Sequence, residues 1–258
     1  MARGLDGAAP SFIYRGATQP DFCVRPYNRI IANGFSAGLE GTVVIDLDGG
    51  VREVIPNTRD KLPACSPDGQ RVTFETNREG EWQIWLHRDI NVRDDNASYK
   101  LGPSYFGHYP AWSSRWQIIW QGCNFWSANG GDCGLWQVPD TGRGTPVRIS
   151  TGGSDTAPDA SPDGSGVAYM SRETGRWQVF TASANGGDNR QLTQEGDSGL
   201  PTWAPDGQAI AFVSNRDGRW GLWVMDVDGR HQRRIAALEP AFGQGPIDWT
   251  EQRISWGP

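Results

Sequence analysis

The chain is poor in histidine and has no long hydrophobic run. Its 258 residues include three histidines, His87, His108 and His231, which fall in different parts of the sequence. This spacing gives no histidine-based metal site and no catalytic triad. No run approaches the roughly 18–20 apolar residues of a membrane helix, so we expect no membrane insertion. The N-terminus also lacks the basic and apolar regions of a signal peptide.

Clustered positive charge is also missing. The formal net charge is −6, and no segment is rich in Lys or Arg. Because phosphate binding depends on clustered cations, the composition argues against nucleic acid as a partner.

The sequence has only four cysteines, two within the first 65 residues of the chain and two near its middle. Cys123 and Cys133 bracket a loop rich in Gly and Asn, as cross-strand partners of a hairpin would. We predict a disulfide there, with two buried thiols as the alternative. Cys23 and Cys65 begin successive repeats, and we expect them to remain unpaired. The compartment is left open, although a Cys123–Cys133 bridge favours an extracytoplasmic site, periplasmic or secreted.

What the chain does contain is a repeat. Ser66-Pro67-Asp68-Gly69, Ser161-Pro162-Asp163-Gly164 and Ala204-Pro205-Asp206-Gly207 each precede an apolar alternation, an Arg-containing turn and a Trp-bearing run. A unit that recurs every 40–45 residues, roughly, is typical of a propeller or a solenoid. The 34 Gly and 17 Pro suit short strands joined by tight turns, and we expect most of the 13 Trp to fill the wedges between blades.

The prolines that open the repeats set the predicted architecture. They are Pro20, Pro63, Pro110, Pro158, Pro201 and, less cleanly, Pro246. No segment keeps a helical period, so the sequence predicts an all-β fold. We expect a six-bladed β-propeller of four-stranded antiparallel blades, with the blades at approximately 20–62, 63–109, 110–157, 158–200, 201–245, and 246–258 plus 1–19. Pairing of N- and C-terminal strands in the last blade would close the ring. The whole chain is then one domain, 1–258, and we expect it to be excised from a longer protein.

These residues resemble the TolB-like, WD-repeat-like propeller repeat. That repeat has a Pro-x-Trp-Ser-Pro-Asp-Gly opening, a Ser-x-Arg-x-Gly turn and an Asp-x-Asp-Gly turn. Blades two, four and five match well, whereas blade three keeps Pro110-Ala111-Trp112-Ser113 and blade one keeps mainly its second half. TolB itself has an α/β domain before its propeller, which this sequence does not include. The resemblance therefore implies a six-bladed propeller whose loop face or central channel engages a protein or peptide.

Aromatic and arginine side chains are the candidates for contact on the loop face. Such residues are enriched in interface hot spots. Arg78, Arg172 and Arg216 are assigned to equivalent turns of blades two, four and five, and they either recognise a partner or brace neighbouring blades. The candidate partner-binding aromatics and histidine are Tyr105, Phe106, His108, Tyr109, Phe125 and Trp126.

Three carboxylates are predicted at one mouth of the central channel. Asp21, Asp159 and Asp248 occupy the same place in the first strand of three units. Held together, they would attract a cation or a basic peptide group, and their repulsion would raise their pKa values. The alternative is that each accepts backbone hydrogen bonds from the adjacent loop. We expect no resident cofactor or metal, although Ca²⁺ on these oxygens stays open.

The sequence as a whole predicts a binding module without enzymatic activity. It would take a protein or peptide partner and be monomeric as an isolated domain. Two alternatives remain. One is a regulatory propeller of a larger prolyl-oligopeptidase-like hydrolase, and the other is a glycan-binding propeller whose exposed aromatics stack on sugar rings.

Overall fold

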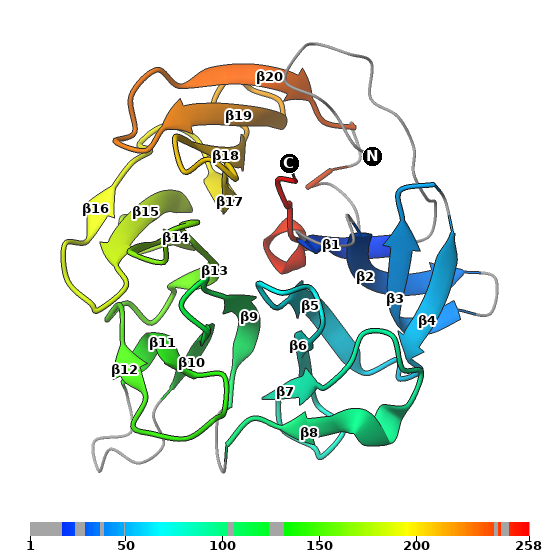
Figure 1. The fold of residues 1–258 in the computed structure, drawn as a ribbon. Coiled ribbons are helices and arrows are strands. Elements are labelled where there is room, and N and C mark those ends of the chain that lie inside the picture. The colour runs from blue at the N-terminus through cyan, green and yellow to red at the C-terminus, as the bar shows by residue number, and fades with distance from the viewer. Residues whose placement is uncertain are drawn as a thin grey trace.

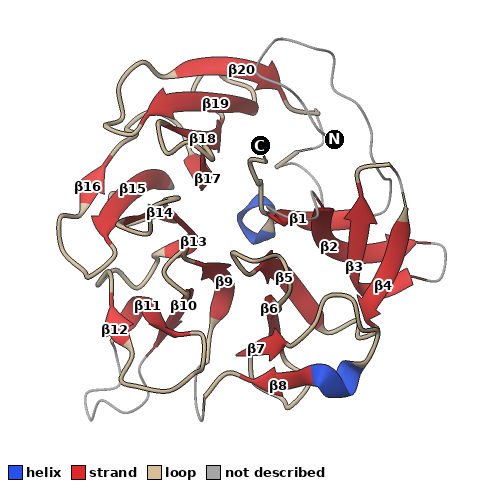
Figure 2. Cartoon of the chain, viewed as in Figure 1, coloured by secondary structure: helices blue, strands red, loops and turns tan. Residues whose placement is uncertain are grey.

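The structure is a computed structural model that describes residues 17–23, 29–36, 39–48, 50–102, 106–123, 132–239, 242–243 and 248–257. Its described part forms five four-stranded antiparallel sheets, arranged as blades around a central axis (Figure 1). Strands make up nearly all of the regular structure (Figure 2). Within the described ranges the helices are two short 3-10 turns, η1 (Asp95–Ala97) and η2 (Trp249–Glu251). Neither is long and apolar enough to cross a membrane.

Each blade runs from an innermost strand near the axis to an outer strand at the rim. Blade one comprises β1 (Ala17–Cys23), β2 (Arg29–Ser36), β3 (Leu39–Asp46) and β4 (Val51–Ile55). Blade two comprises β5 (Asp60–Cys65), β6 (Val72–Thr76), β7 (Gln83–His87) and β8 (Ser98–Lys100). Blade three comprises β9 (His108–Trp112), β10 (Gln117–Cys123), β11 (Cys133–Pro139) and β12 (Val147–Arg148). Blade four comprises β13 (Thr156–Ala160), β14 (Gly166–Ser171), β15 (Gln178–Ser183) and β16 (Arg190–Gln191). Blade five comprises β17 (Ser198–Trp203), β18 (Ala209–Ser214), β19 (Gly221–Asp226) and β20 (Arg233–Ala237).

The Pro-Asp-Gly motifs form the turn between the first and second strands of blades two, four and five. The N–H of Gly69 donates to the carbonyl oxygen of Ser66 over 2.8 Å, and Gly164 and Gly207 close the same turn over 2.8 and 2.9 Å. The three glycines have φ angles of 66°, 68° and 71°. This left-handed region costs glycine little because it lacks a Cβ atom. The motif therefore fixes where the innermost strand ends in these three blades.

A bulge interrupts every innermost strand at the residue that precedes its proline. These residues all have φ between 48° and 54°, although none is glycine: Gln19, Leu62, Tyr109, Ala157 and Leu200. Such a conformation is strained for an L side chain and persists where the surroundings hold it. The side chain of Gln19 accepts a hydrogen bond from the N–H of Leu62 over 3.0 Å, and Glu75 accepts one from the N–H of Tyr109 over 2.8 Å. Side chains of one blade therefore support the bulge of the next.

The hydrophobic core is divided among the interfaces between neighbouring blades. Between blades two and three, Ile84 and Leu86 pack in one cluster with Trp112, Trp120 and Trp136. These three tryptophans are at most 8% exposed, as expected for residues that fill a wedge. Comparable clusters join blades one and two, three and four, and four and five. Burial between blades, rather than inside one sheet, thus holds the ring together.

The prediction of six blades closed by terminal strands is wrong. The described residues form five sheets, and β1 pairs with β2 alone. Residues 248–257, assigned to the sixth blade, instead form η2 and an extended segment near the axis (Figure 1). This segment contacts β1 through side chains: Gln19 Nε2 donates to the carbonyl oxygen of Glu251 over 2.8 Å, and the N–H of Phe22 donates to Ser255 Oγ over 2.9 Å. Such bonds do not make a strand ladder. Residues 1–16 lie outside the described residues.

Both cysteine pairs form disulfides. Cys123 and Cys133 face each other in the register of β10 and β11, which confirms the predicted bridge. The expectation that Cys23 and Cys65 stay unpaired is wrong. The ends of β1 and β5 lie side by side, with a Cα–Cα distance of 5.3 Å, and a disulfide links them. This bond joins blade one to blade two covalently.

Candidate functional site

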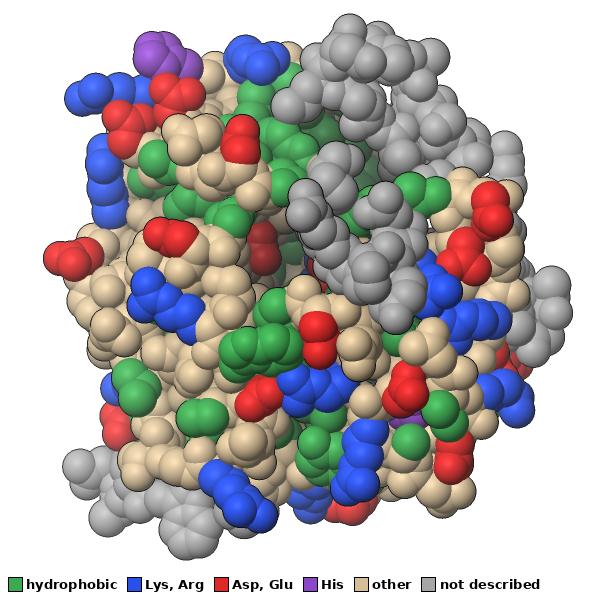
Figure 3. Space-filling view, viewed as in Figure 1, with side chains coloured by type: hydrophobic (Ala, Val, Ile, Leu, Met, Phe, Trp, Pro, Cys, Tyr) green, Lys and Arg blue, Asp and Glu red, His purple; other side chains and the backbone are tan. Residues whose placement is uncertain are grey.

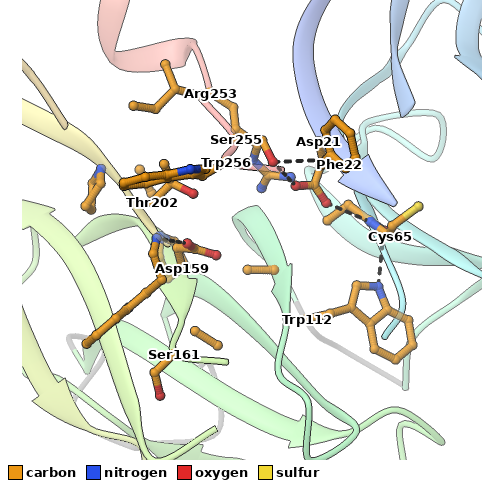
Figure 4. Close-up of a pocket in the computed structure, with 18 of the residues that line it drawn as sticks. Asp21, Phe22, Cys65, Trp112, Asp159, Ser161, Thr202, Arg253, Ser255 and Trp256 are labelled. Atoms are coloured by element: carbon orange, nitrogen blue, oxygen red, sulfur yellow. Dashed lines mark hydrogen bonds between the residues drawn. The ribbon is translucent and has the colours of Figure 1, made fainter. Parts of the chain in front are cut away.

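A cavity of about 310 Å³ lies on the propeller axis. Its wall is built by the innermost strands, by the turns that follow them and by residues 252–256 of the C-terminal segment (Figure 4). The space-filling view is hollowed near the same axis, between hydrophobic side chains (Figure 3). The cavity is therefore formed jointly by all five blades.

Residues at one repeated position, two after each bulge, line this cavity. They are Asp21, Ala64, Ala111, Asp159 and Thr202. The alignment of the repeats places these residues in one ring, and the structure brings two of its carboxylates, Asp21 and Asp159, into the same cavity. Asp248 does not line it. Asp248 is exposed and caps η2, where its Oδ1 accepts from the N–H of Thr250 over 2.9 Å.

The two cavity carboxylates each connect one blade to the next. Asp159 Oδ2 accepts from the main-chain N–H of Trp203 over 2.7 Å, and Asp21 Oδ2 accepts in the same way from Cys65 over 2.9 Å. The Ser255 hydroxyl donates to Asp21 Oδ1 over 3.1 Å (Figure 4). Asp21 and Asp159 therefore accept backbone hydrogen bonds, as the alternative prediction has it, and they also line the cavity.

Burial inside the channel changes the acidity of Asp159. It raises the pKa of this carboxyl from 3.8 to about 6, and the negative charge of Asp21 acts in the same direction. The hydrogen bond from Trp203 and the positive charge of Arg253 oppose the rise. Burial is the larger cause of the raised pKa, and the predicted repulsion between the carboxylates is a smaller one. Near pH 6, Asp159 therefore changes between a neutral group and an anion.

The C-terminal segment contributes the cation of the cavity. Arg253 donates through Nη1 to the carbonyl oxygen of Pro63 over 2.8 Å and through Nη2 to that of Pro110 over 2.5 Å. Its guanidinium thereby joins blades two and three at the axis. Trp256 of the same segment also lines the cavity. No sequence signal marked Arg253 or Trp256 as site residues, because their place depends on the path of the segment through the channel.

The predicted loop-face arginines make contacts within their own blades. Arg78 pairs with Asp60 over 2.6 Å and with Asp95 over 2.8 Å. Arg216 donates to Ser198 Oγ over 3.2 Å. Arg172 is not their equivalent, since its carbonyl closes the turn at the place that Asn77 and Asn215 occupy in the other blades. It lies one residue earlier, with its guanidinium 5.6 Å from the ring centroid of Trp177.

The aromatic candidates are placed differently from one another. Tyr109 is buried at the cavity wall, and its hydroxyl donates to the carbonyl oxygen of Thr250. The His108 ring lies 5.4 Å from the ring of Trp82, and Phe106 forms a single bridge with Gln83. The remaining candidates lie outside the described residues: Tyr105, Phe125 and Trp126.

Comparisons with known proteins agree with this architecture. A family model described as the TolB β-propeller domain matches residues 6–246. A TolB-assigned protein from Agrobacterium tumefaciens superposes with a TM-score of 0.72 at 19% identity, covering 86% of this chain and 81% of that one. TolB from Acinetobacter baumannii superposes with a TM-score of 0.64 at 22% identity, and the match covers 79% of this chain and 50% of that one. A gluconolactonase from Xanthomonas campestris superposes with a TM-score of 0.61 at 15% identity, and the match covers 88% of this chain and 77% of that one.

The limits of these likenesses are set by identity and length. At sequence identities of 15–22%, the likeness to these solved structures shows a shared fold and does not show a shared function. The chain spans half the length of the Acinetobacter protein. No protein of curated function matches the sequence.

Proposed function

Because the chain belongs to the TolB β-propeller family, we propose that it is a non-enzymatic module that binds a protein or peptide in its central cavity. One observation carries the proposal. Residues 252–256 already lie in this channel as an extended peptide, with Arg253 bonded to inner-strand carbonyls and Ser255 bonded to Asp21. The channel therefore offers the acceptors that an extended chain with basic and hydroxyl side chains requires.

The chemistry of the wall suggests which peptides fit. Trp112, Trp203 and several prolines provide apolar surface, and Asp159 adds a carboxylate that points into the cavity (Figure 4). Aromatic walls with a few placed polar groups are usual in sites that bind ligands. We infer that a basic side chain beside apolar residues is the preferred element of the partner.

The two disulfides support an oxidising compartment. Both link strands of the propeller, Cys23 to Cys65 and Cys123 to Cys133. Structural disulfides persist mainly in secreted and periplasmic proteins. We therefore infer that the partner is met outside the cytoplasm.

Fluorescence anisotropy with three labelled decapeptides tests the proposal. They contain Leu and Ala with either Lys, Glu or Ser. At about pH 7.5 we expect the Lys peptide to bind the chain, and Asp159→Asn to weaken it at least tenfold. Asp206→Asn changes an exposed acid of a Pro-Asp-Gly turn and is the matched control. No binding by any peptide, or equal affinity in both variants, would count against the cavity as the site.

A further inference from the structure

The innermost strands of blades two, four and five have related residues two positions before the bulge. In blade two this residue is Asp60, which is 1% exposed and accepts from Arg78 Nη2 over 2.6 and 2.8 Å. In blade five it is Ser198, which accepts from Arg216 over 3.2 Å. Each therefore meets a guanidinium from the turn between the second and third strands of its own blade.

Blade four keeps the acid but replaces the guanidinium by a second acid. The residue at the place of Asp60 is Asp155, and Glu173 stands at the place of Arg78. Asp155 is 2% exposed. Its Oδ2 accepts from the N–H of Gly152 over 2.9 Å, whereas its buried Oδ1 has no hydrogen-bond partner among the described residues. A buried carboxylate oxygen without a partner is costly unless a cation balances it.

The two carboxylates converge on one point beside Gly152. A Cβ atom on this glycine would lie 2.2 Å from Glu173 Oε1 and 2.4 Å from Asp155 Oδ1. The two oxygens are therefore separated by no more than the sum of these distances, and any larger residue at Gly152 would fill the space. This group of oxygens thus favours the approach of positive charge.

The neighbouring arginines, Arg148 and Arg172, contact other groups rather than these two carboxylates. Arg148 pairs with Asp132 over 3.2 Å and donates through Nε to the carbonyl oxygen of Ser150 over 3.0 Å. Arg172 lies over the ring of Trp177. Among the described residues, neither Asp155 nor Glu173 forms an ion pair within 4.0 Å. The balancing charge is therefore not supplied by this part of the chain.

We propose that Asp155 and Glu173 bind a divalent cation of the Ca²⁺ type. Ca²⁺ prefers carboxylates and other hard oxygen ligands, in flexible geometry. In the described ranges no third His, Cys, Asp or Glu joins these two residues, so water and neutral oxygens complete the coordination. A Ca²⁺ site with only two carboxylate ligands is comparable to the weak sites of extracellular modules, which have Kd values of about 10⁻⁴–10⁻³ M.

The proposed cation site is separate from the proposed peptide site. Asp155 and Glu173 are not among the residues that line the central cavity. Asp155 directly precedes β13 and Glu173 lies in the turn after β14, whereas the turn from Ser161 to Gly164 lies at the other end of β13. Failure of either proposal therefore leaves the other one standing.

Isothermal titration calorimetry of the EDTA-treated full chain with CaCl₂ tests the site. We expect one Ca²⁺ per chain, with a Kd in the range of about 10⁻⁴–10⁻³ M. Glu173→Gln and Asp155→Asn should each weaken binding at least tenfold. Asp188→Asn removes an exposed acid of the same blade and should leave the affinity unchanged. Absence of binding to the parent chain, or parental affinity in Glu173→Gln, overturns the proposal.

A third variant, Glu173→Arg, rebuilds the ion pair of blade two in blade four. It should abolish the response to CaCl₂ and raise the Tm measured in EDTA, because a guanidinium then reaches Asp155. Glu173 is exposed, so its variants test the site even if Asp155→Asn fails to fold. A proton shared by the two carboxyl groups would give a Tm that depends on pH and not on CaCl₂. That result also overturns the proposal.

Discussion

The carboxylate of Asp159 lies 2.7 Å from the main-chain nitrogen of Trp203 and connects blade four to blade five. Asp21 makes the matching contact with Cys65 between blades one and two. Both acids also face the central cavity. A ligand that binds these carboxylates would therefore act directly on contacts between blades, and the charge of Asp159 affects stability and binding together.

The raised pKa of Asp159 predicts a measurable effect on stability. Its folded value of about 6 exceeds the ordinary 3.8, so the folded chain holds this proton more tightly than the unfolded chain. The stabilising contribution is complete below about pH 4 and is lost as the pH rises through about 6. The full difference is at most about 3 kcal/mol. Asp159→Asn should therefore lose this part of the pH dependence, which urea unfolding between pH 4 and pH 8 would measure.

The matched change Asp159→Ala separates charge from hydrogen bonding. Asn keeps an acceptor for the N–H of Trp203, whereas Ala leaves that donor unpaired, at a cost of about 1–3 kcal/mol. We expect the Asn variant to be at least as stable as the parent at pH 8, and the Ala variant to be less stable. Equal losses in both variants would show that the charge itself holds the blades together.

The two disulfides should differ in their contribution to stability. Cys23 and Cys65 are 42 residues apart, whereas Cys123 and Cys133 are 10 apart. In the chain-entropy description, these loops correspond to about 4 and about 3 kcal/mol. Replacing both cysteines of a pair by Ser should thus lower the free energy of unfolding more for the first pair. Guanidinium unfolding of the two double variants measures this, and the reverse order would contradict it.

The repeats predicted much of the fold because their information is local. Pro-Asp-Gly turns depend on a few neighbouring residues, so Gly69, Gly164 and Gly207 mark three blades correctly. The same alignment places Asp21 and Asp159 at one position of their strands, and repetition then carries both to the axis. The repeated local pattern is therefore enough to predict that these two acids lie near the axis.

The features that sequence did not predict depend on contacts between distant segments. Dividing the chain length by the repeat period gives six units, but a blade requires backbone ladders, which residues 248–257 do not form with β1. The pairing of Cys23 with Cys65 depends on how blades one and two pack. The sequence alignment puts Arg172 at the position of Arg78, whereas the structure puts Glu173 there, so the alignment does not reveal that Glu173 faces Asp155.

The guanidinium of Arg253 should contribute both to stability and to the shape of the cavity. Arg253→Met keeps a long side chain but removes the hydrogen bonds to Pro63 and Pro110, and we expect a loss of roughly 2 kcal/mol. Arg230→Met is the control because that side chain is 76% exposed. Thermal unfolding measures both variants. A Tm equal to that of the control would show that the C-terminal segment is not held through Arg253.

The cavity and the loop face can be separated as partner sites by two double variants. Asp21→Asn with Asp159→Asn neutralises the cavity, whereas Phe125→Ala with Trp126→Ala removes the predicted aromatic anchors of the loop face. If the peptide lies on the axis, the Lys decapeptide should lose its affinity in the first variant alone, because only that variant removes the anionic acceptors. Anisotropy titrations, with the Tm of each variant as the folding control, measure this. Loss of affinity in the loop variant alone, at an unchanged Tm, would place the partner on the loop face and leave the cavity carboxylates with a structural role between blades.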